Sequence, residues 1–267
     1  MATRKTAIAI GAHPDDVEFY MAGTLLLLGR AGHEIHYLNV ASGNCGSVEY
    51  SSAMAKTIRA AEAREAAKTL GAVFHPSLTD DLDIIYSLEL LRKLAAVIRE
   101  VKPAIILTHP PQDYMEDHTN TCRLAVTAAF ARAMPNFKSS PARPVEDYET
   151  TIYHTMPHGL CDPLRRKVIP AAYVNTTDTH RQKREALAAH KSQQDWLDKS
   201  QKLNSYLLAM EDMSLELGRR SKKFKHAEGW RRHLHFGFCR EEADPLCDAL
   251  GKDFLHNRAY DAVLSGE

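Results

Sequence analysis

Residues 7–18 of this chain read Ala-Ile-Ala-Ile-Gly-Ala-His-Pro-Asp-Asp-Val-Glu, an apolar run that leads directly into polar side chains. The apolar part is typical of a strand that is buried on both faces of a parallel sheet. The proline and the two aspartates that follow indicate the start of a helix. We therefore expect His13, Asp15 and Asp16 at the carboxyl end of a strand, which is where open α/β sheets bind their ligands.

A second polar cluster, Asp113 to His118, follows another apolar run at residues 104–107. A helix start would account for the carboxylates of both clusters, but it does not require their histidines. Catalytic zinc sites combine nitrogen and oxygen ligands with one open position. We predict such a site from His13, Asp16 and His118, with Asp15 left free to act as the general base.

Apolar periodicity predicts alternating strands and helices along most of the chain. Such alternation favours an α/β fold, Rossmann-like, with a mostly parallel sheet covered by helices on both faces. We expect a single domain over residues 1–267, with 175–267 as a mainly helical C-terminal extension. The predicted strands lie at about 7–11, 34–41, 72–75, 104–107, 151–155 and 167–174, and the later predicted helices at 179–191 and 196–217.

Two of the predicted helices matter for the site. The first spans about residues 17–31 without interruption. The second ends at Gly71, which suits a C-terminal cap, and carries Met54, Ile58 and Ala61 on its predicted buried face. On that assignment Arg59 lies off the apolar face, and its guanidinium is free to reach the edge of the sheet.

The composition restricts the class of partner. The chain has 267 residues, of which 44% are hydrophobic, and its 34 Lys and Arg residues equal its 34 Asp and Glu residues. Without a net basic field we expect no nucleic-acid partner but a small neutral or polar substrate. No apolar run approaches the length of a membrane span, so we expect none. Five scattered cysteines without a C-x-x-C pair indicate reduced thiols. We expect a cytoplasmic protein that forms a homo-oligomer.

The motif Ala-His-Pro-Asp-Asp-Val-Glu, together with the later Asp-x-x-x-Asp-His, resembles the LmbE-like, PIG-L-type family of metal-dependent de-N-acetylases. The resemblance implies one Zn²⁺ per chain, or another divalent metal, and N-acetylated amino sugars as substrates. It implies that His13, Asp16 and His118 are metal ligands and that Asp15 is the general base. It also implies sugar contacts for two further residues, Arg59 and Asp81.

This chain departs from the family pattern at Met115. Many members have a histidine at that position, which acts as an acid or stabilises the oxyanion. Here Asp15, Tyr114 or another histidine must supply that function. We include Tyr114 among the expected substrate-binding residues, together with Asn44 of the flexible loop 42–47, whose glycines let the backbone approach a ligand.

The favoured function is a zinc-dependent hydrolase that removes an N-acetyl group from an N-acetylglucosamine-type sugar or conjugate. Two alternatives remain open: an amidase that acts on a thiol-sugar conjugate, and a non-catalytic metal-binding protein of Rossmann-like fold. A nucleotide-binding oxidoreductase is disfavoured because the first strand-to-helix turn has Gly11 alone rather than G-x-G-x-x-G.

Overall fold

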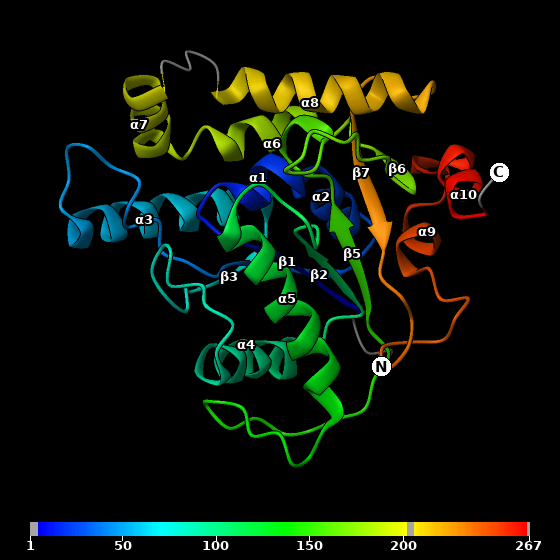
Figure 1. Ribbon diagram of the computed structural model, residues 1–267, viewed down its shortest axis with the longest axis horizontal. Coiled ribbons are helices and arrows are strands. Elements are labelled where there is room, and N and C mark those ends of the chain that lie inside the picture. The colour runs from blue at the N-terminus through cyan, green and yellow to red at the C-terminus, as the bar shows by residue number, and fades with distance from the viewer. Residues whose placement is uncertain (1–4, 202–205, 266–267) are drawn as a thin grey trace.

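The computed structural model describes residues 5–201 and 206–265, and these residues form one eight-stranded sheet with the order β3-β2-β1-β4-β5-β7-β6-β8 (Figure 1). Strands β1 to β5 are parallel, and the remaining pairings are antiparallel. The sheet therefore confirms the predicted α/β class. The strands are β1 Thr6–Gly11, β2 Glu34–Asn39, β3 Val73–His75, β4 Ile105–Thr108, β5 Thr151–Thr155, β6 Ala172–Asn175, β7 Ala227–Arg232 and β8 Phe254–His256.

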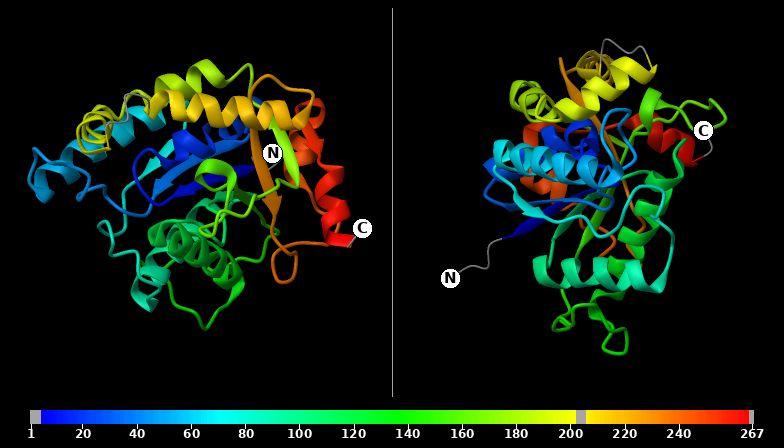
Figure 2. Two further views of the ribbon diagram at one scale, coloured as in Figure 1. Left: turned by 45° about the horizontal axis from the view of Figure 1, so that its top comes forward. Right: turned by 90° about the vertical axis from the view of Figure 1, so that its left-hand side faces the viewer.

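Helices cover both faces of the sheet (Figures 1 and 2). Along β1, Ala7 and Ala9 point into the cluster formed with α2, α3 and α6, whereas Ile8 and Ile10 point into the cluster formed with α4 and α5. This alternation follows from the two-residue period of a strand, and both faces are apolar because both are covered. The helices are α1 Asp16–Tyr20, α2 Ala22–Arg30, α3 Ser52–Leu70, α4 Leu88–Val101, α5 Glu116–Phe130, α6 His180–Leu187, α7 Lys191–Gln201, α8 Tyr206–Ser221, α9 Pro245–Leu250 and α10 Arg258–Ser265.

The direction in which the chain builds the sheet reverses beside β1. From β1 the chain adds β2 and β3 on one side, and it then crosses over to add β4 and β5 on the other. Such a reversal leaves a crevice at the carboxyl ends of the two central strands, because the following connections diverge to opposite sides. The chain segments after β1 and β4 carry the two polar clusters of the sequence to this crevice.

The predicted helix 17–31 is wrong in one respect, because it is divided into α1 and α2 at Met21, whose φ of −131° and ψ of −17° are not helical. The carboxylate of Glu228 in β7 accepts 2.8 Å hydrogen bonds from the backbone N–H groups of Gly23 and Thr24. It thus satisfies free donors in the first turn of α2. A residue two hundred positions away cannot be found from local periodicity.

The predicted buried face of α3 is also wrong. Met54 is 53% exposed, and Ala61 is exposed as well. The buried positions of this helix are Ala55, Arg59, Ala63, Ala66, Ala67 and Leu70. Small side chains on that face let α3 pack against α6 and α7, and the same rotation turns Arg59 inward towards the crevice.

The C-terminal part of the chain is mainly helical, but it also supplies β7 and β8, which continue the sheet. Strand β7 inserts between β5 and β6, so the antiparallel part is built from segments distant in sequence. The strand predicted at 167–174 is shorter and lies at Ala172–Asn175. The helix predicted at 196–217 corresponds to α7 and α8, and residues 202–205 between them lie outside the described part.

Within the described ranges, no helix combines the length and the apolar character that crossing a membrane requires.

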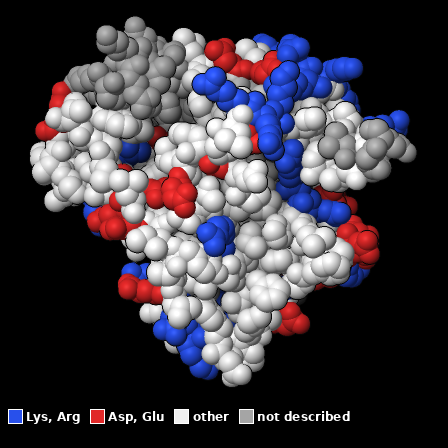
Figure 3. All heavy atoms as spheres, viewed as in Figure 1, with Lys and Arg blue, Asp and Glu red and all other residues white. Residues whose placement is uncertain are grey.

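The balanced charge of the chain is unevenly distributed. Figure 3 shows Lys and Arg side chains gathered in a band at the upper right, where α8 ends in Figure 1. Arg219 and Arg220 lie in the last turn of α8, and both bind Glu216. The basic band lies at the end of α8, whereas the polar clusters of the sequence meet at the carboxyl ends of β1 and β4.

Candidate active site

A cavity of about 380 Å³ opens at the carboxyl ends of β1 and β4. Its floor comes from the two polar clusters of the sequence, and its walls come from α1, α3, α7, α8 and the turn after β5. Asp16 starts α1, and His118 lies in the first turn of α5. Two helix starts therefore direct polar side chains into one cavity.

The three predicted metal ligands lie together. One potential ligand atom from each of His13, Asp16 and His118 lies within 4.8 Å of the other two. His118 Nε2 is 3.3 Å from Asp16 Oδ1, and His13 Nδ1 is 3.5 Å from Asp16 Oδ2. The Asp16 carboxylate thus lies between two imidazoles, in a mixed nitrogen and oxygen donor set with room for an additional ligand.

The outward-facing nitrogen of each imidazole has a carboxylate partner of its own. Asp117 Oδ2 lies 2.9 Å from His13 Nε2, and Asp113 Oδ1 lies 3.1 Å from His118 Nδ1. Histidines that bind metals are commonly oriented in this way, because the outer hydrogen bond selects the tautomer and directs the inner nitrogen. The donor set of these residues therefore fits a divalent cation.

The raised pKa values of the two histidines agree with a site that favours a cation. Burial opposes protonation of His118, but Asp16 and Asp113 outweigh it and raise its pKa to about 10. Burial likewise opposes protonation of His13, but hydrogen bonds to Asp117 and Asp16 raise its pKa to about 9. The surrounding carboxylates hence create a negative field that favours positive charge at this point.

His109 supports this cluster from behind. Its Nε2 accepts a 3.0 Å hydrogen bond from the backbone N–H of Ala12, and its ring stacks on that of His118 with centroids 4.0 Å apart. His109, Asp113 and His118 also form a compact group of potential ligands. Because Asp113 already binds the outer nitrogen of His118, we interpret this group as support for the first.

Asp15 is held separately from the predicted ligands. Its φ of 114° lies in the left-handed region, which is strained for a residue with a side chain. Burial raises the pKa of Asp15 to about 6, while the nearby Arg59 opposes this rise. Arg59 Nη2 lies 3.4 Å from Asp15 Oδ2, and the same guanidinium donates to the Pro14 carbonyl and to Gln193. The guanidinium is thus buried and engaged, not free as the sequence led us to expect.

The other residues predicted to contact the substrate occupy different positions relative to the cavity. Tyr114 is 60% exposed and lines the cavity. Asp81 also lines it, but its carboxylate accepts hydrogen bonds of 2.7 and 3.0 Å from the backbone N–H groups of Gly43 and Cys45. Asn44 accepts from the Asp81 backbone and is not among the residues that line the cavity. Asp81 and Asn44 therefore brace the loop, and their roles in substrate binding remain predictions.

Sequence reasoning did not place several cavity residues from the second half of the chain. Trp196, Leu197 and Tyr206 form an apolar wall from α7 and α8, opposite Phe19 of α1. The Tyr206 side chain also hydrogen-bonds to Asp15. His158, in the turn after β5, lines the same cavity. No local motif marks these residues, because only the packing of α7 and α8 over the sheet edge brings them there.

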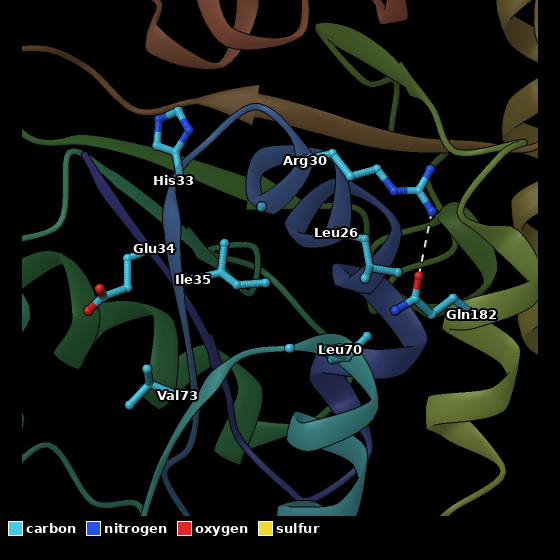
Figure 4. Close-up of a pocket in the computed structure, with 10 residues that line it drawn as sticks. Leu26, Arg30, His33, Glu34, Ile35, Leu70, Val73 and Gln182 are labelled. Carbon is cyan, nitrogen blue, oxygen red and sulfur yellow. Dashed lines mark hydrogen bonds between the residues drawn. The ribbon is translucent and has the colours of Figure 1, made fainter. Parts of the chain in front are cut away.

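A second cavity, of about 470 Å³, lies near the starts of β2 and β3, at the opposite edge of the sheet (Figure 4). Leu26, Ile35, Leu70 and Val73 contribute to it, and Arg30 reaches Gln182 across 3.5 Å. The figure shows the side chains of the consecutive residues His33 and Glu34 pointing in different directions. This cavity lacks the convergent donors of the first.

Comparison with known proteins finds a family model that matches part of the chain. Residues 8–130 match the PIG-L family, described as GlcNAc-PI de-N-acetylase. The chain is 29% identical over 142 residues to the diacetylchitobiose deacetylase of Thermococcus kodakarensis, a match that covers 51% of this chain and 53% of that protein. It is 28% identical over 143 residues to the 4-oxalmesaconate hydratase of Pseudomonas putida, covering 51% and 55% respectively. The chain thus spans about half the length of the curated relatives it matches.

A solved structure, the 4-carboxy-2-hydroxymuconate hydratase from Pseudomonas putida, superposes on 90% of this chain and 99% of its own with a TM-score of 0.73 and 22% identity. At this identity the similarity establishes the fold alone. The fold therefore extends well beyond the residues that match the family, into the part that supplies β7 and the apolar wall.

Proposed function

We propose that this chain, whose residues 8–130 match the PIG-L family, is a metal-dependent hydrolase that removes an N-acetyl group from an N-acetylglucosamine-type sugar or conjugate. The observation that carries the proposal is the pairing of two sets of groups in one cavity. His13, Asp16 and His118 form a three-ligand set, and Asp15 stands beside them without being part of it. Hydrolysis of an amide needs both an electrophilic centre and a base.

In the proposed reaction, the oxygen of a water molecule bonds to the amide carbon while Asp15 accepts a proton from that water. The C–N bond then breaks, and the proton passes to the leaving nitrogen, so that acetate and a free amine result. A zinc ion held by the three ligands would lower the pKa of water towards about 7 and polarise the carbonyl group. The pKa of Asp15, raised to about 6 by burial, suits a base that works near neutral pH.

Arg59 and Tyr206 support Asp15 in this role. Both bind its side chain, at a residue whose backbone is left-handed. A base that is held from two sides loses little freedom when the substrate binds. In this proposal Arg59 acts mainly by positioning Asp15, in addition to any contact with the sugar.

The cavity fits a neutral substrate with an apolar face. Arg59 is the one Lys or Arg among the described residues that line it, and its guanidinium is engaged by protein groups. Four aspartates also line the cavity, which disfavours a substrate with several negative charges. Trp196 and Phe19 offer surfaces of the kind on which the apolar faces of sugar rings stack.

A hydratase is the second candidate, because two of the similar proteins are hydratases. The carboxylated substrate in the name of the structural relative would need cationic partners, and the cavity offers no cation free of protein contacts among its described residues. The deacetylase is therefore the better-supported function. An amidase that acts on a thiol-sugar conjugate would use the same groups on a larger substrate, and a non-catalytic metal-binding protein would not need Asp15 to be held in position.

One experiment separates these functions. The purified protein, supplied with zinc, is incubated with N-acetylglucosamine, with N,N'-diacetylchitobiose and with 4-carboxy-2-hydroxymuconate. We expect acetate release from the acetylated sugars and no loss of the muconate absorbance. Loss of muconate absorbance without acetate release would establish the hydratase instead, and neither reaction in a metal-loaded protein would reject both.

A further inference from the structure

The turn that follows β5 holds one histidine over the cavity. Pro157 and Leu160 are buried at the base of this turn, and the Leu160 N–H donates a 3.0 Å hydrogen bond to the Pro157 carbonyl. Leu160 is 4% exposed and packs with Met156 and Leu217. Between the two anchors, His158 projects outward. The turn is thus attached to the core at both ends, and His158 lies at its exposed point.

The backbone of this turn is left-handed at two consecutive residues, and it is strained at Leu160. Gly159 has a φ of 70°, and Leu160 has a φ of 55°, which is unusual for a bulky side chain. Glycine adopts this conformation without strain, whereas a leucine keeps it only where the surroundings enforce it. Here the burial of the Leu160 side chain enforces the conformation, and its consequence is the direction in which His158 points.

The imidazole of His158 lies between two aromatic rings and has unused polar atoms. Its centroid is 5.6 Å from that of Phe19 and 6.2 Å from that of Tyr114. It lines the same cavity as Asp15 and His118, and within the described residues it makes no hydrogen bond or ion pair. His13 and His118 differ in this respect, because each is held by a carboxylate. His158 is therefore the cavity histidine that remains available to a substrate.

Addition of water to an amide places negative charge on the carbonyl oxygen, and hydrogen-bond donors aimed at that oxygen accelerate the reaction. The cavity has few candidates for this role. The aspartates accept hydrogen bonds, Met115 has no side-chain donor, and the guanidinium of Arg59 is engaged, whereas the hydroxyl of Tyr114 and the imidazole of His158 both line the cavity. Burial lowers the pKa of His158, so its ring is neutral near pH 7 and carries one N–H. A neutral imidazole suits a donor that must not give up its proton.

We propose that His158 is a catalytic residue that donates a hydrogen bond from its imidazole N–H to the substrate carbonyl oxygen as that oxygen becomes negative. The inference rests on the proposed amide hydrolysis and assigns this residue a role in it. The proton stays on His158 throughout, and it is the Asp15 carboxylate that carries a proton from water to the leaving nitrogen. Met115, which lines the same cavity, has no side-chain donor for this role.

The test compares three variants of the full chain in the zinc-loaded state. His158→Ala should lower kcat for acetate release by about 10²- to 10³-fold, as loss of one oxyanion donor does elsewhere, with KM and metal content close to wild type. His158→Gln keeps a neutral N–H donor and should recover at least part of the loss. His256→Ala, which removes an exposed histidine of β8 outside the cavity, should match wild type.

A binding measurement separates this inference from the proposed function. The probe is the methylphosphonamidate of glucosamine, which carries the tetrahedral negative centre without being hydrolysed at the carbonyl. Wild type should bind it at least about tenfold more tightly than His158→Ala, while both bind glucosamine equally. Wild-type kcat in His158→Ala, or equal affinity of both proteins for the probe, would overturn the role of His158. Probe binding that depends on His158, in a protein that releases no acetate, would support this residue and reject the deacetylase.

Discussion

Arg59 Nη2 lies 3.4 Å from Asp15 Oδ2, and the two residues are only 2% and 6% exposed. They come from different elements, α3 and the turn between β1 and α1. An arginine buried against a carboxylate is costly to desolvate, so its retention needs additional hydrogen bonds. The Pro14 carbonyl and Gln193 supply them, which makes Arg59 the centre of the contacts that hold the proposed base.

We expect Arg59→Ala to lower both the free energy of unfolding and kcat. Removing one partner of a buried ion pair leaves an uncompensated charge and costs about 3–5 kcal/mol. Urea unfolding and acetate release measure the two effects. Lys68→Ala, which removes an exposed cation of the same helix, is the control and should change neither. Wild-type stability in Arg59→Ala would show that Asp15 does not depend on this arginine.

Asp15→Asn should retain the metal and lose most of its turnover. The substitution removes the proposed base but leaves His13, Asp16 and His118 in place. Loss of a general base typically costs about 10²- to 10⁴-fold in rate. Elemental analysis and kcat are measured on the same preparation. Unchanged turnover would remove Asp15 from the mechanism, and loss of metal would make it a ligand.

Two substitutions at the predicted metal site should weaken zinc binding to different extents. His118→Ala should abolish stoichiometric binding of one zinc ion per chain, because it removes a ligand. Asp113→Asn should weaken binding by about 10- to 100-fold, because Asp113 orients His118 through a 3.1 Å contact. Competition with a chelator measures both affinities. Full stoichiometry and wild-type affinity in His118→Ala would show that the ligand set is different.

The free energy of unfolding should depend on pH through His226, whose ring stacks on that of His180 with centroids 3.7 Å apart. Burial, together with the nearby His180, lowers the pKa of His226 from 6.5 to about 4. His226 is therefore protonated below about pH 6.5 in the unfolded chain, but only below about pH 4 in the folded chain. Stability from this residue is present above pH 6.5 and is lost as the pH falls through this window.

For one proton the slope in that window is at most about 1.4 kcal/mol per pH unit. Urea unfolding of wild type and His226→Gln at pH 7, 6 and 5 isolates the contribution of this side chain. The glutamine variant should lose less stability between pH 7 and 5 than wild type does. Equal losses in both proteins would contradict the assigned shift.

Local sequence was sufficient for much of the fold. The two polar clusters follow apolar strands, and the parallel arrangement predicted from alternation places both strand ends at one edge. This is why His13, Asp16 and His118 could be named together from the sequence. The reasoning rests on short-range rules, namely strand period, helix start and the direction of parallel strands, which do not depend on the rest of the chain.

Tertiary structure decided the features that depend on distant partners. The buried face of α3 follows from packing against α6 and α7, and an alanine-rich helix has too little contrast between its faces to reveal this from periodicity. The start of α2 after Met21 is capped by Glu228, and the insertion of β7 between β5 and β6 depends on the whole C-terminal part. In each case the free energy comes from contacts between segments far apart in sequence, which no local window contains.

In the site as well, some features were predictable from the sequence and others required the tertiary structure. Sequence alone determined the candidate metal ligands and the candidate base, because their chemistry is concentrated in two short motifs. Only the folded chain brings Arg59 to Asp15, places Asp113 and Asp117 on the outer nitrogens of the histidines, and directs His158 into the cavity. These relationships require particular distances and directions between side chains, and those are set by the packing of whole elements rather than by the identity of neighbouring residues.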